Sequence, residues 1–418
     1  MTVFKYQEGR LSVEGLPLSV IAEEVDTPAY VYSRAAFSAP LEAFEEAFKD
    51  LPHLICFSVK SAANLALLAL VAERGQGADI VSGGELFKAL RAGIDPGKVV
   101  FSGVGKTGRE MREALAAEIL MFNVESAEEL EALALEAEQM KLRAPVAFRI
   151  NPDVDPGTHP YVATGLKESK FGLAPEEALS LYHKAAQNPH LEVRGIACHI
   201  GSQLLSAGPF LAAAEKLKNL VLELKSAGIE LRYFDMGGGL GIQYNDETPP
   251  SLNEYADGLK KVLKELPGLT LIVEPGRFIA GNSCVLLTRV LYNKTNGRKH
   301  FVVVDGAMND LVRPSLYGAY QSILPLKESG LTPVTVDVVG PICESGDFLA
   351  KDRPLPPLQK GDLLAVMGAG AYGFTMSSNY NARPRAAVVL VSEGKFHIIK
   401  PRENYEDLVR GESSPIGL

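Results

Sequence analysis

The stretch from Leu54 to Ser82, LICFSVK-SAAN-LALLALVAERGQ-GADIVS, decides the fold class. It opens with a short apolar run that ends at Lys60, continues through a helix-like segment and returns to a second apolar run that ends at Ser82. Strands that are buried on both faces of a parallel sheet form near-continuous apolar runs of this kind. The stretch therefore predicts a strand–helix–strand unit of an α/β fold.

The same unit recurs toward the C-terminus. Further apolar runs, most of them followed by a helix-like segment, end at Gly103, Val124, Asn151, Gly201, Gly238 and Pro275. Eight such units within about 250 residues is the size of a (β/α)8 barrel of the TIM type. We therefore expect this barrel over residues 31–280.

The polar residues of these runs support the barrel more strongly than their number does. Each run is apolar until its last positions, where the polar residues are Lys60, Ser82, Ser102, Asn123, Arg149, His199, Asp235 and Glu274. In a barrel the C-terminal ends of the strands build the active site. A doubly wound open sheet would instead bind its ligand at a single crevice. The pattern thus predicts a functional site at the C-terminal end of a barrel.

The pattern changes after about residue 280 and becomes all-β. The segments CVLLTRVLYN and HFVVVD flank Asn296-Gly297, which indicates a hairpin with a tight turn. VTVDVVG, DLLAVMG and AAVVLV follow, and a turn at Glu393-Gly394 leads to KFHIIK. The N-terminal runs LPLSVIAEE and PAYVYS also resemble strands. We therefore expect an all-β domain, a barrel or sandwich, formed by residues 281–418 and completed by residues 1–30.

Composition excludes several classes of function. The net charge of −9 argues against nucleic acid as a partner, because phosphate binding needs a basic face. The N-terminus, MTVFKYQEGRLSVEG, lacks the apolar run of a signal peptide, and no segment approaches the length of a membrane span. Four cysteines without CxxC spacing disfavour a zinc site or a disulfide framework. We expect a cytoplasmic, reduced protein without a bound metal.

Three positions near the predicted strand ends suggest cofactor chemistry. Lys60 would be costly to bury as a charge, so it is either a Schiff-base lysine or an ordinary surface lysine just past its strand. Glu274 could keep a cofactor's pyridine nitrogen protonated, or simply pair with Arg277. His199 could stack on a cofactor ring, or be a satisfied core histidine. The residues alone leave these alternatives open.

Two glycine-rich segments and one cysteine complete the candidates. DMGGGLG, from Asp235 to Gly241, could let backbone N–H groups approach a phosphate, although a tight turn is an equal alternative. GAGAYGF, which contains Tyr372, could likewise be a plain turn. A lone cysteine is usually a small buried hydrophobe. Cys343, however, lies in CESGD, whose polar residues favour an exposed, reactive thiol.

The chain resembles the diaminopimelate decarboxylases, which are fold-type III, alanine-racemase-like enzymes dependent on pyridoxal phosphate. The resemblance runs almost end to end, through FSVKSAANLALL, GADIVSGGEL, VVFSGVGKT, HPYVATGLKESKFG, HIGSQ, DMGGGLGI, EPGRFIAG, CESGDFLAKDRPLP and GAYGFTMSSNYNARPR. Any one string could mislead, but their order and spacing make coincidence improbable. One departure is SVKSAAN, where many relatives have AVKAN; the lysine is kept.

The resemblance implies specific roles for the cofactor site. Lys60 would carry the cofactor covalently, His199 would stack on its ring, and Glu274 would pair with the ring nitrogen. The phosphate would be held by Gly238, Gly239, Gly276, Ser202 and the hydroxyl of Tyr372, with Arg277 also beside the cofactor.

It also implies how the substrate is held. Arg277, Arg313 and Tyr317 would hold the substrate's distal carboxylate, near Tyr372. Glu344 would bind the distal ammonium, and Cys343 would donate the proton. In the family Cys343 and Glu344 enter the partner subunit's pocket, so the resemblance also implies a homodimer with the active site at the subunit interface.

The resemblance implies decarboxylation of meso-2,6-diaminopimelate to L-lysine and CO2, the last step of lysine biosynthesis, and charge matching supports this substrate. The retained end of this substrate needs a cation for its carboxylate and an anion for its ammonium. Ornithine has no distal carboxylate, so a site for it would leave a buried arginine unpaired, which is costly. Loss of CO2 would leave a carbanion that the cofactor stabilises. Protonation by Cys343 would then complete the reaction.

Other functions remain as alternatives. The same fold could decarboxylate carboxynorspermidine, ornithine or arginine, although Arg313 and the intact CESGD weigh against this. An amino-acid racemase is disfavoured by Glu274, because a strong electron sink suits decarboxylation. A non-catalytic regulatory homologue should have lost Lys60 or Cys343, and both are present.

Overall fold

The computed structural model describes residues 3–155, 157 and 169–413, and it divides the chain into two compact units. One unit combines Met1–Ser38 with Ala280–Leu418, and the other is Ala39–Ile279. The first unit extends past residue 30 because strand β4 (Ala29–Ser33) pairs with two strands from the C-terminal part of the chain, β13 (Cys284–Asn296) and β19 (Ala387–Ser392).

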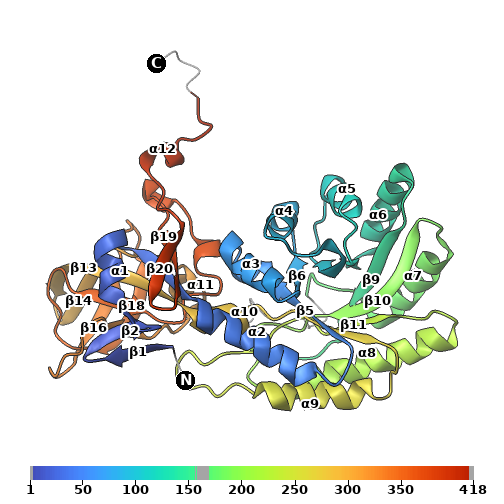
Figure 1. The fold of residues 1–418 in the computed structure, drawn as a ribbon, viewed down its shortest axis with the longest axis horizontal. Coiled ribbons are helices and arrows are strands. Elements are labelled where there is room, and N and C mark those ends of the chain that lie inside the picture. Colours follow the sequence, from blue (N-terminus) through green and yellow to red (C-terminus); the bar gives the residue numbers. More distant parts are fainter. Residues whose placement is uncertain (1–2, 156, 158–168, 414–418) are drawn as a thin grey trace. The chain divides into compact units, whose positions relative to one another are not determined.

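The unit Ala39–Ile279 contains a closed barrel of eight parallel strands, as the sequence predicts (Figure 1). Its strands are β5 (His53–Ser58), β6 (Gly77–Ile80), β7 (Val99–Phe101), β8 (Met121–Val124), β9 (Ala144–Ile150), β10 (Leu191–Cys198), β11 (Tyr233–Asp235) and β12 (Thr270–Val273). Each strand pairs with the next in sequence, and β12 pairs with β5 to close the ring.

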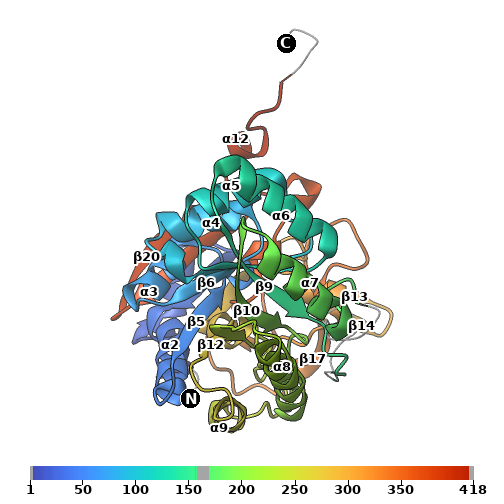
Figure 2. The same ribbon diagram turned by 90° about the vertical axis from the view of Figure 1, so that its right-hand side faces the viewer.

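Helices connect these strands and lie outside them (Figure 2). They are α2 (Arg34–Phe48), α3 (Leu65–Glu73), α4 (Gly83–Arg91), α5 (Gly108–Ala116), α6 (Ala127–Met140), α7 (Pro175–Gln187), α8 (Gly208–Ser226), α9 (Leu252–Leu263) and the short α10 (Arg277–Ala280). Five of them begin at a residue whose side-chain oxygen accepts a backbone N–H of the first turn, namely Asn64, Ser82, Thr107, Ser126 and Ser251. Such caps are typically worth about 1 kcal/mol each and fix where a helix begins.

The side-chain alternation of the strands places the polar residues at one end of the barrel interior. An apolar cluster contains Cys56, Val100, Leu120, Met121, Ala147 and Ile272, which lie on or next to strands β5, β7, β8, β9 and β12. Side chains two positions apart lie on the same face of a strand. Two positions after members of this cluster stand Ser58, Ser102, Asn123, Arg149 and Glu274. A polar layer therefore follows an apolar layer, toward the C-terminal ends of the strands.

The unit Met1–Ser38 with Ala280–Leu418 is built mainly from strands. A three-stranded sheet contains β1 (Phe4–Gln7), β2 (Arg10–Val13) and β3 (Leu16–Pro17). The main sheet runs β17-β16-β14-β13-β4-β19-β20, and β18 pairs with both β13 and β15. The remaining bounds are β14 (Lys299–Val304), β15 (Ile323–Pro325), β16 (Val334–Val339), β17 (Phe348–Leu355), β18 (Leu363–Val366), β20 (Lys395–Lys400), α11 (Arg313–Tyr317) and α12 (Tyr405–Leu408). The two predicted hairpins, β13–β14 and β19–β20, are antiparallel pairs, as expected.

One predicted strand is wrong. LPLSVIAEE forms only the two-residue strand β3 and then helix α1 (Leu18–Val25). The buried residues of α1 are Leu18, Ile21 and Ala22, a spacing of three and four that matches one face of a helix. They pack in an apolar cluster with Val31, Val285 and Val389. Short apolar runs are ambiguous between strand and helix, and here tertiary packing selects the helix.

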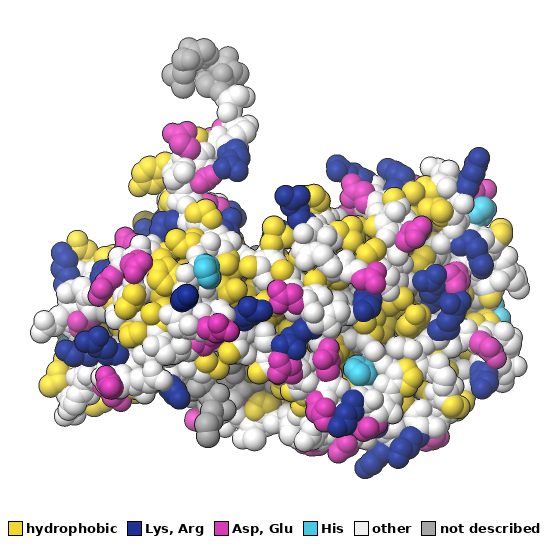
Figure 3. All heavy atoms as spheres, in the orientation of Figure 1, with side chains coloured by type: hydrophobic (Ala, Val, Ile, Leu, Met, Phe, Trp, Pro, Cys, Tyr) yellow, Lys and Arg dark blue, Asp and Glu magenta, His cyan; other side chains and the backbone are white. Residues whose placement is uncertain are grey.

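The surface carries charges of both signs. On the face drawn in Figure 3, Lys and Arg side chains are interspersed with Asp and Glu side chains instead of forming one basic area. None of the helices within the described residues is both long and apolar enough to cross a membrane.

Candidate active site

Lys60 lies at the C-terminal end of the barrel, in a single 3-10 turn (Val59–Ser61) that follows β5. Its Nζ forms an ion pair with Asp79 of β6 and lies 3.1 Å from the Oγ of Ser58. The Asp79 side chain is fully buried, whereas about a third of the Lys60 side chain, 32%, stays exposed. The amine is thus held against a buried carboxylate while it remains open to solvent on one side.

Ser58 and Asp79 fix this arrangement. The Oγ of Ser58 donates to Oδ2 of Asp79 at 2.6 Å and lies 3.2 Å from the carbonyl oxygen of Glu274. Oδ1 of Asp79 is buried and receives no hydrogen bond from the described residues. The sequence analysis did not single out Asp79, although a carboxylate inside the apolar run GADIVS was a signal for it.

Glu274 follows β12 and is 5% exposed. Its Oε1 lies 3.5 Å from Nδ2 of Asn123, which also donates to Oδ2 of Asp235 at 3.1 Å. Burial, and then the neighbouring charges of Asp235 and Asp79, raise the pKa of Glu274 well above its usual value. Burial also raises the pKa of Asp235, to about 6. Nδ2 of Asn123 thus lies near both carboxyl groups, and because two buried negative charges would repel each other, this end of the barrel favours a bound proton.

His199 follows β10 and presents a neutral imidazole. Its Nδ1 accepts a hydrogen bond from the backbone N–H of Gly238 at 3.1 Å, which assigns the ring proton to Nε2. Burial, with the positive charges of Arg149 and Lys60, lowers the pKa of His199 well below its usual value. A neutral ring of fixed orientation can stack on a flat heterocycle without adding charge to it.

The loop Gly237–Gly239 needs its glycines for close packing. A Cβ on Gly238 would lie 2.2 Å from the carbonyl oxygen of Glu274, and one on Gly239 would lie 2.4 Å from that of Gly201. Gly237 and Gly239 also have positive φ, 64° and 120°. Gly276 is crowded as well, because its Cβ would lie 2.8 Å from the Cβ of Ser58. The backbone N–H of Gly238 donates a hydrogen bond to His199, a contact that the sequence did not indicate.

Arg277 begins the short helix α10 and is 7% exposed. Its guanidinium donates to the Oγ of Ser202, at 3.3 Å from Nε and 3.0 Å from Nη2, and to the hydroxyl of Tyr244 at 2.9 Å. Ser202 and Arg277, expected on the sequence at one site, are therefore in contact. Tyr244 is a neighbour that the sequence analysis missed.

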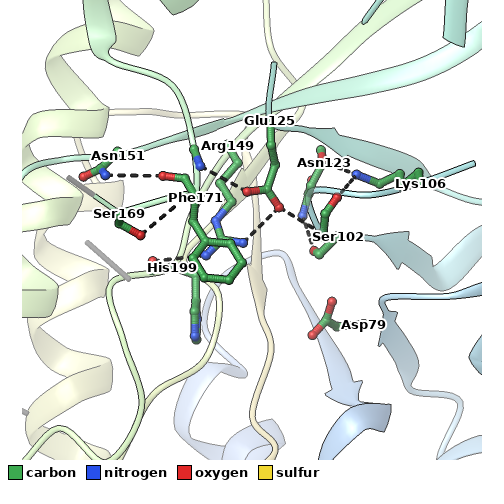
Figure 4. A network of polar contacts seen from close by, with 12 residues as sticks. Asp79, Ser102, Lys106, Asn123, Glu125, Arg149, Asn151, Ser169, Phe171 and His199 are labelled. Carbon is green, nitrogen blue, oxygen red and sulfur yellow. Dashed lines mark hydrogen bonds and ion pairs between the residues drawn. The ribbon is translucent and has the colours of Figure 1, made fainter. Parts of the chain in front are cut away.

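A second polar network surrounds Arg149 (Figure 4). Nη1 of Arg149 donates to Oε1 of Glu125 at 3.0 Å, and its guanidinium lies 4.7 Å from the centre of the Phe171 ring. Oε2 of Glu125 accepts the N–H of Gly172 at 3.0 Å, and Asn151 donates to the carbonyl of Phe171 at 3.3 Å. These contacts anchor the end of the motif HPYVATGLKESKFG; residues 158–168, which include most of it, lie outside the described part of the chain.

The other predicted site residues belong to the β unit. Arg313 and Tyr317 are the first and last residues of helix α11, so they are one turn apart. The side-chain amide of Gln321 has one orientation in which both its nitrogen and its oxygen form hydrogen bonds. In this orientation Oε1 of Gln321 accepts a hydrogen bond from Nη1 of Arg313 at 2.7 Å. Tyr372 lies in the loop after β18, with a φ of 57°.

Cys343 and Glu344 lie in the loop between β16 and β17. Cys343 is exposed, and its backbone N–H donates to Oδ1 of Asn381 at 2.8 Å. A hydrogen bond with Glu344 raises the pKa of Tyr380. Asp347 closes the loop, because its carboxylate accepts the N–H groups of Met308 and Ile342 at 2.8 and 2.7 Å.

The structure thus brings one group of the predicted residues together. Lys60, His199, Gly238, Gly239, Glu274 and Gly276 share the C-terminal end of the barrel, next to Ser202 and Arg277. Among the described residues, no cluster of three or more His, Cys, Asp or Glu side chains could hold a metal ion.

The sequence matches a family model described as pyridoxal-dependent decarboxylase, pyridoxal binding domain, over residues 34–281. It is 52% identical to a diaminopimelate decarboxylase of Pseudomonas aeruginosa, over 99% of both chains.

Two solved structures are similar over nearly the whole chain. One is diaminopimelate decarboxylase of Helicobacter pylori in complex with L-lysine, with a TM-score of 0.91 and 43% identity, covering 94% of this chain and 98% of that one. The other is diaminopimelate decarboxylase of M. jannaschii in complex with L-lysine, with a TM-score of 0.94 and 38% identity, covering 99% and 98%.

Proposed function

The chain belongs to the pyridoxal-dependent decarboxylases and, within them, to the diaminopimelate decarboxylases, and we propose that it uses Lys60 to decarboxylate meso-2,6-diaminopimelate to L-lysine and CO2. The observation that carries this proposal is the meeting of Lys60, Glu274 and His199 at one end of the barrel. A pyridoxal cofactor uses an amine for its Schiff base and a partner for its pyridine nitrogen, and a neutral imidazole can stack on its ring.

The residues present fit pyridoxal phosphate. Lys60 is the amine that would bind the cofactor covalently, and Glu274 is buried where it can hold the proton of the ring nitrogen. Oδ1 of Asp79 and Oδ1 of Asn123 are buried and receive no hydrogen bond from the described residues, so the pocket offers polar atoms for a ligand to contact. The cofactor's ring, when bound, accepts the electron pair that departure of CO2 leaves behind.

Other residues of the barrel would orient the cofactor. His199 would cover one face of the ring, in the orientation that Gly238 fixes through Nδ1. Gly239, Gly276 and Ser202 would hold the phosphate, together with Gly238 and the hydroxyl of Tyr372. The crowding at Gly238 and Gly276 supports this role only in part, because it shows that these loops pack tightly, as a close backbone approach requires.

The substrate's distal end would be recognised by charge. Arg277, Arg313 and Tyr317 would hold the distal carboxylate, with Tyr372 nearby, and Glu344 would hold the distal ammonium. Arg313 and Tyr317 support this because they lie on one turn of α11, and Gln321 steadies the guanidinium. A diamine precursor without a distal carboxylate would leave the positive charges of Arg277 and Arg313 without a negative partner, which is costly in a desolvated site.

Cys343 would donate the proton that replaces the lost carboxyl group. Its exposure makes the thiol accessible, unlike Cys56, Cys198 and Cys284, which are buried and whose pKa values burial raises. We further propose a homodimer in which Cys343 and Glu344 serve the partner's site, in the cytoplasm, where all four cysteines would stay reduced.

The test is turnover of a substrate panel by the full-length protein with pyridoxal phosphate. The account predicts CO2 and lysine from meso-diaminopimelate, with little from ornithine, arginine or carboxynorspermidine. Arg313→Lys tests the proposed recognition of the distal carboxylate, because it keeps the charge but loses the planar guanidinium that binds a carboxylate with two hydrogen bonds. Preferred turnover of ornithine, arginine or carboxynorspermidine would contradict the assignment of Arg313 and Glu344. No turnover despite cofactor binding would favour a regulatory homologue.

A further inference from the structure

The barrel encloses three carboxyl groups beneath the Lys60 amine. Asp79, Asp235 and Glu274 are 0%, 0% and 5% exposed. Lys60 forms its ion pair with Asp79. If all three carboxyl groups were ionised, Asp235 and Glu274 would repel each other in a site from which water is largely excluded. Such a pair is stable when it holds one proton between its two members.

The contacts of Asp235 show which member accepts. Its Oδ1 receives the backbone N–H of Gly237 at 2.8 Å, and its Oδ2 receives Nδ2 of Asn123 at 3.1 Å. Two donors aimed at one carboxyl group favour its ionised form. Glu274, by contrast, lies at a longer 3.5 Å from the same Nδ2 of Asn123. One proton on the pair would relieve the repulsion between the two carboxyl groups, and the weaker donor contact of Glu274 assigns the proton to Glu274.

Other ionisable and polar groups surround this pair. Those whose charge or polarity acts on it are Lys60 and Asp79 beside β5 and β6, Ser102 and Asn123 on the next strands, Arg149 and His199, the buried thiols Cys56 and Cys198, and Tyr255. Burial raises the pKa values of both thiols and of Tyr255, so these three stay neutral and leave the proton to the carboxyl pair.

We propose that Asp235 and Glu274 share one proton before the cofactor binds, and that Glu274 passes this stored proton to the cofactor's ring nitrogen during loading. In this step the O–H bond of Glu274 breaks and an N–H bond forms. The electron pair of the broken bond stays on Glu274, which becomes the carboxylate partner of the charged ring. Asp235 touches neither cofactor nor substrate in this scheme, so it is a positioning residue. The inference rests on the proposed function, because it assumes that the site takes a pyridoxal cofactor.

The first experiment needs no cofactor. Infrared spectra of the cofactor-free, full-length protein at about pH 8.5 should show the carbonyl stretch of a protonated carboxyl group. At this pH two other acids with raised pKa values, Glu85 and Asp310, both at about 7, are mostly ionised and contribute little. Asp235→Asn should abolish the band. The amide still accepts the N–H of Gly237 but now offers an N–H to Glu274, which favours the ionised glutamate.

Two further variants complete this measurement. Glu274→Gln should also abolish the band, and it serves if Asp235→Asn fails to fold. Asp310→Asn is the matched control, a buried acid elsewhere in the chain, and should leave the band unchanged. A band that survives in Asp235→Asn would overturn the inference, because Glu274 would then hold its proton without Asp235. Absence of the band from the unmodified protein would overturn it as well.

The second experiment separates this inference from the proposed function. Calorimetric titration with pyridoxal phosphate, in two amine-free buffers of different ionisation enthalpy, counts the protons taken up on loading. Asp235→Asn should take up about one proton more than the unmodified protein, because its Glu274 has none to give. Equal proton uptake by both proteins would contradict the proposal of a stored proton, but it would not contradict the proposed function. Failure of the unmodified protein to bind the cofactor would overturn both.

Discussion

Lys60 and Asp79 form an ion pair across neighbouring strand ends of the barrel, where Asp79 is fully buried and Lys60 remains partly exposed. The carboxylate is held by Ser58 as well as by the amine, so its position does not depend on Lys60 alone. The pair holds the amine in place, and a neighbouring carboxylate favours the charged form of an amine. It is therefore the contact on which the chemistry at Lys60 depends most directly.

Asp79→Asn should move the pH dependence of cofactor attachment to lower pH. The substitution keeps the shape of the side chain but removes the negative charge that stabilises the ammonium form of Lys60. The neutral amine, which attacks the cofactor's aldehyde, then forms at lower pH, by roughly one unit or more. The measurement is the rate at which visible absorbance develops after mixing with pyridoxal phosphate.

Glu129→Gln is the matched control for this prediction. It breaks another buried pair of the barrel, Lys106–Glu129, whose Nζ and Oε1 are 2.7 Å apart. The pH midpoint of cofactor attachment in Glu129→Gln should equal that of the unmodified protein. An unchanged midpoint in Asp79→Asn would show that Asp79 does not control Lys60.

Cys343→Ser should lower kcat for diaminopimelate by about 10²- to 10⁴-fold, the usual contribution of a general acid. Because Cys343 is proposed to protonate the substrate and not to hold the cofactor, the absorbance of the bound cofactor should not change. Ser345→Ala, at an exposed neighbouring position, should keep nearly full activity. A Cys343→Ser protein with a kcat close to that of the unmodified protein would exclude Cys343 as the proton donor.

Gly238→Ala should lower the free energy of unfolding by about 2–4 kcal/mol, because the new methyl group would lie 2.2 Å from the carbonyl oxygen of Glu274. The strain should also displace His199, which is hydrogen-bonded to Gly238, and weaken cofactor binding. Thermal unfolding and cofactor titration measure the two effects. Gly105→Ala, which meets no atom within 4 Å, should change neither, and equal stability of the two variants would contradict the packing described.

Asp310 should make the β unit less stable as the pH rises. Burial raises the pKa of Asp310 to about 7, whereas in the unfolded chain it should be near 4. Between these values the folded state binds more protons than the unfolded state, so the free energy of unfolding falls as the pH rises from about 4 to 7. Asp310→Asn cannot ionise and should lose this decline, which denaturant unfolding at several pH values measures. A slope that persists in Asp310→Asn would assign the decline to other groups.

Much of the barrel, and the place of its polar candidate residues at the C-terminal ends of the strands, could be predicted because both follow from local pattern. Alternation along a strand places polar residues two positions beyond apolar ones, and Lys60, His199 and Glu274 stand where that pattern ends. The glycines of Gly237–Gly239 were visible as a cluster, but the contact that forbids a side chain at Gly238 involves a neighbouring strand end. Such contacts appear only when the barrel is closed.

Three features escaped prediction for physical reasons. Asp79 lies within an apolar strand, and its role depends on the pairing of β5 with β6, which brings it to Lys60. The run after Leu16 has apolar residues that suit either a strand or a helix, and its packing against Val31 and Val285 selects the helix α1. The proton that we propose Asp235 and Glu274 to share likewise depends on the burial of both side chains, which residue type alone does not reveal.

The attachment point of the cofactor tests the central claim most directly. The full-length protein, loaded with pyridoxal phosphate and reduced with borohydride, is digested and its peptides are analysed by mass spectrometry. The account predicts one modified peptide, which carries the cofactor on Lys60, and none in the Lys60→Ala protein treated in the same way. Modification of a different lysine at full occupancy, or its persistence in Lys60→Ala, would contradict the account.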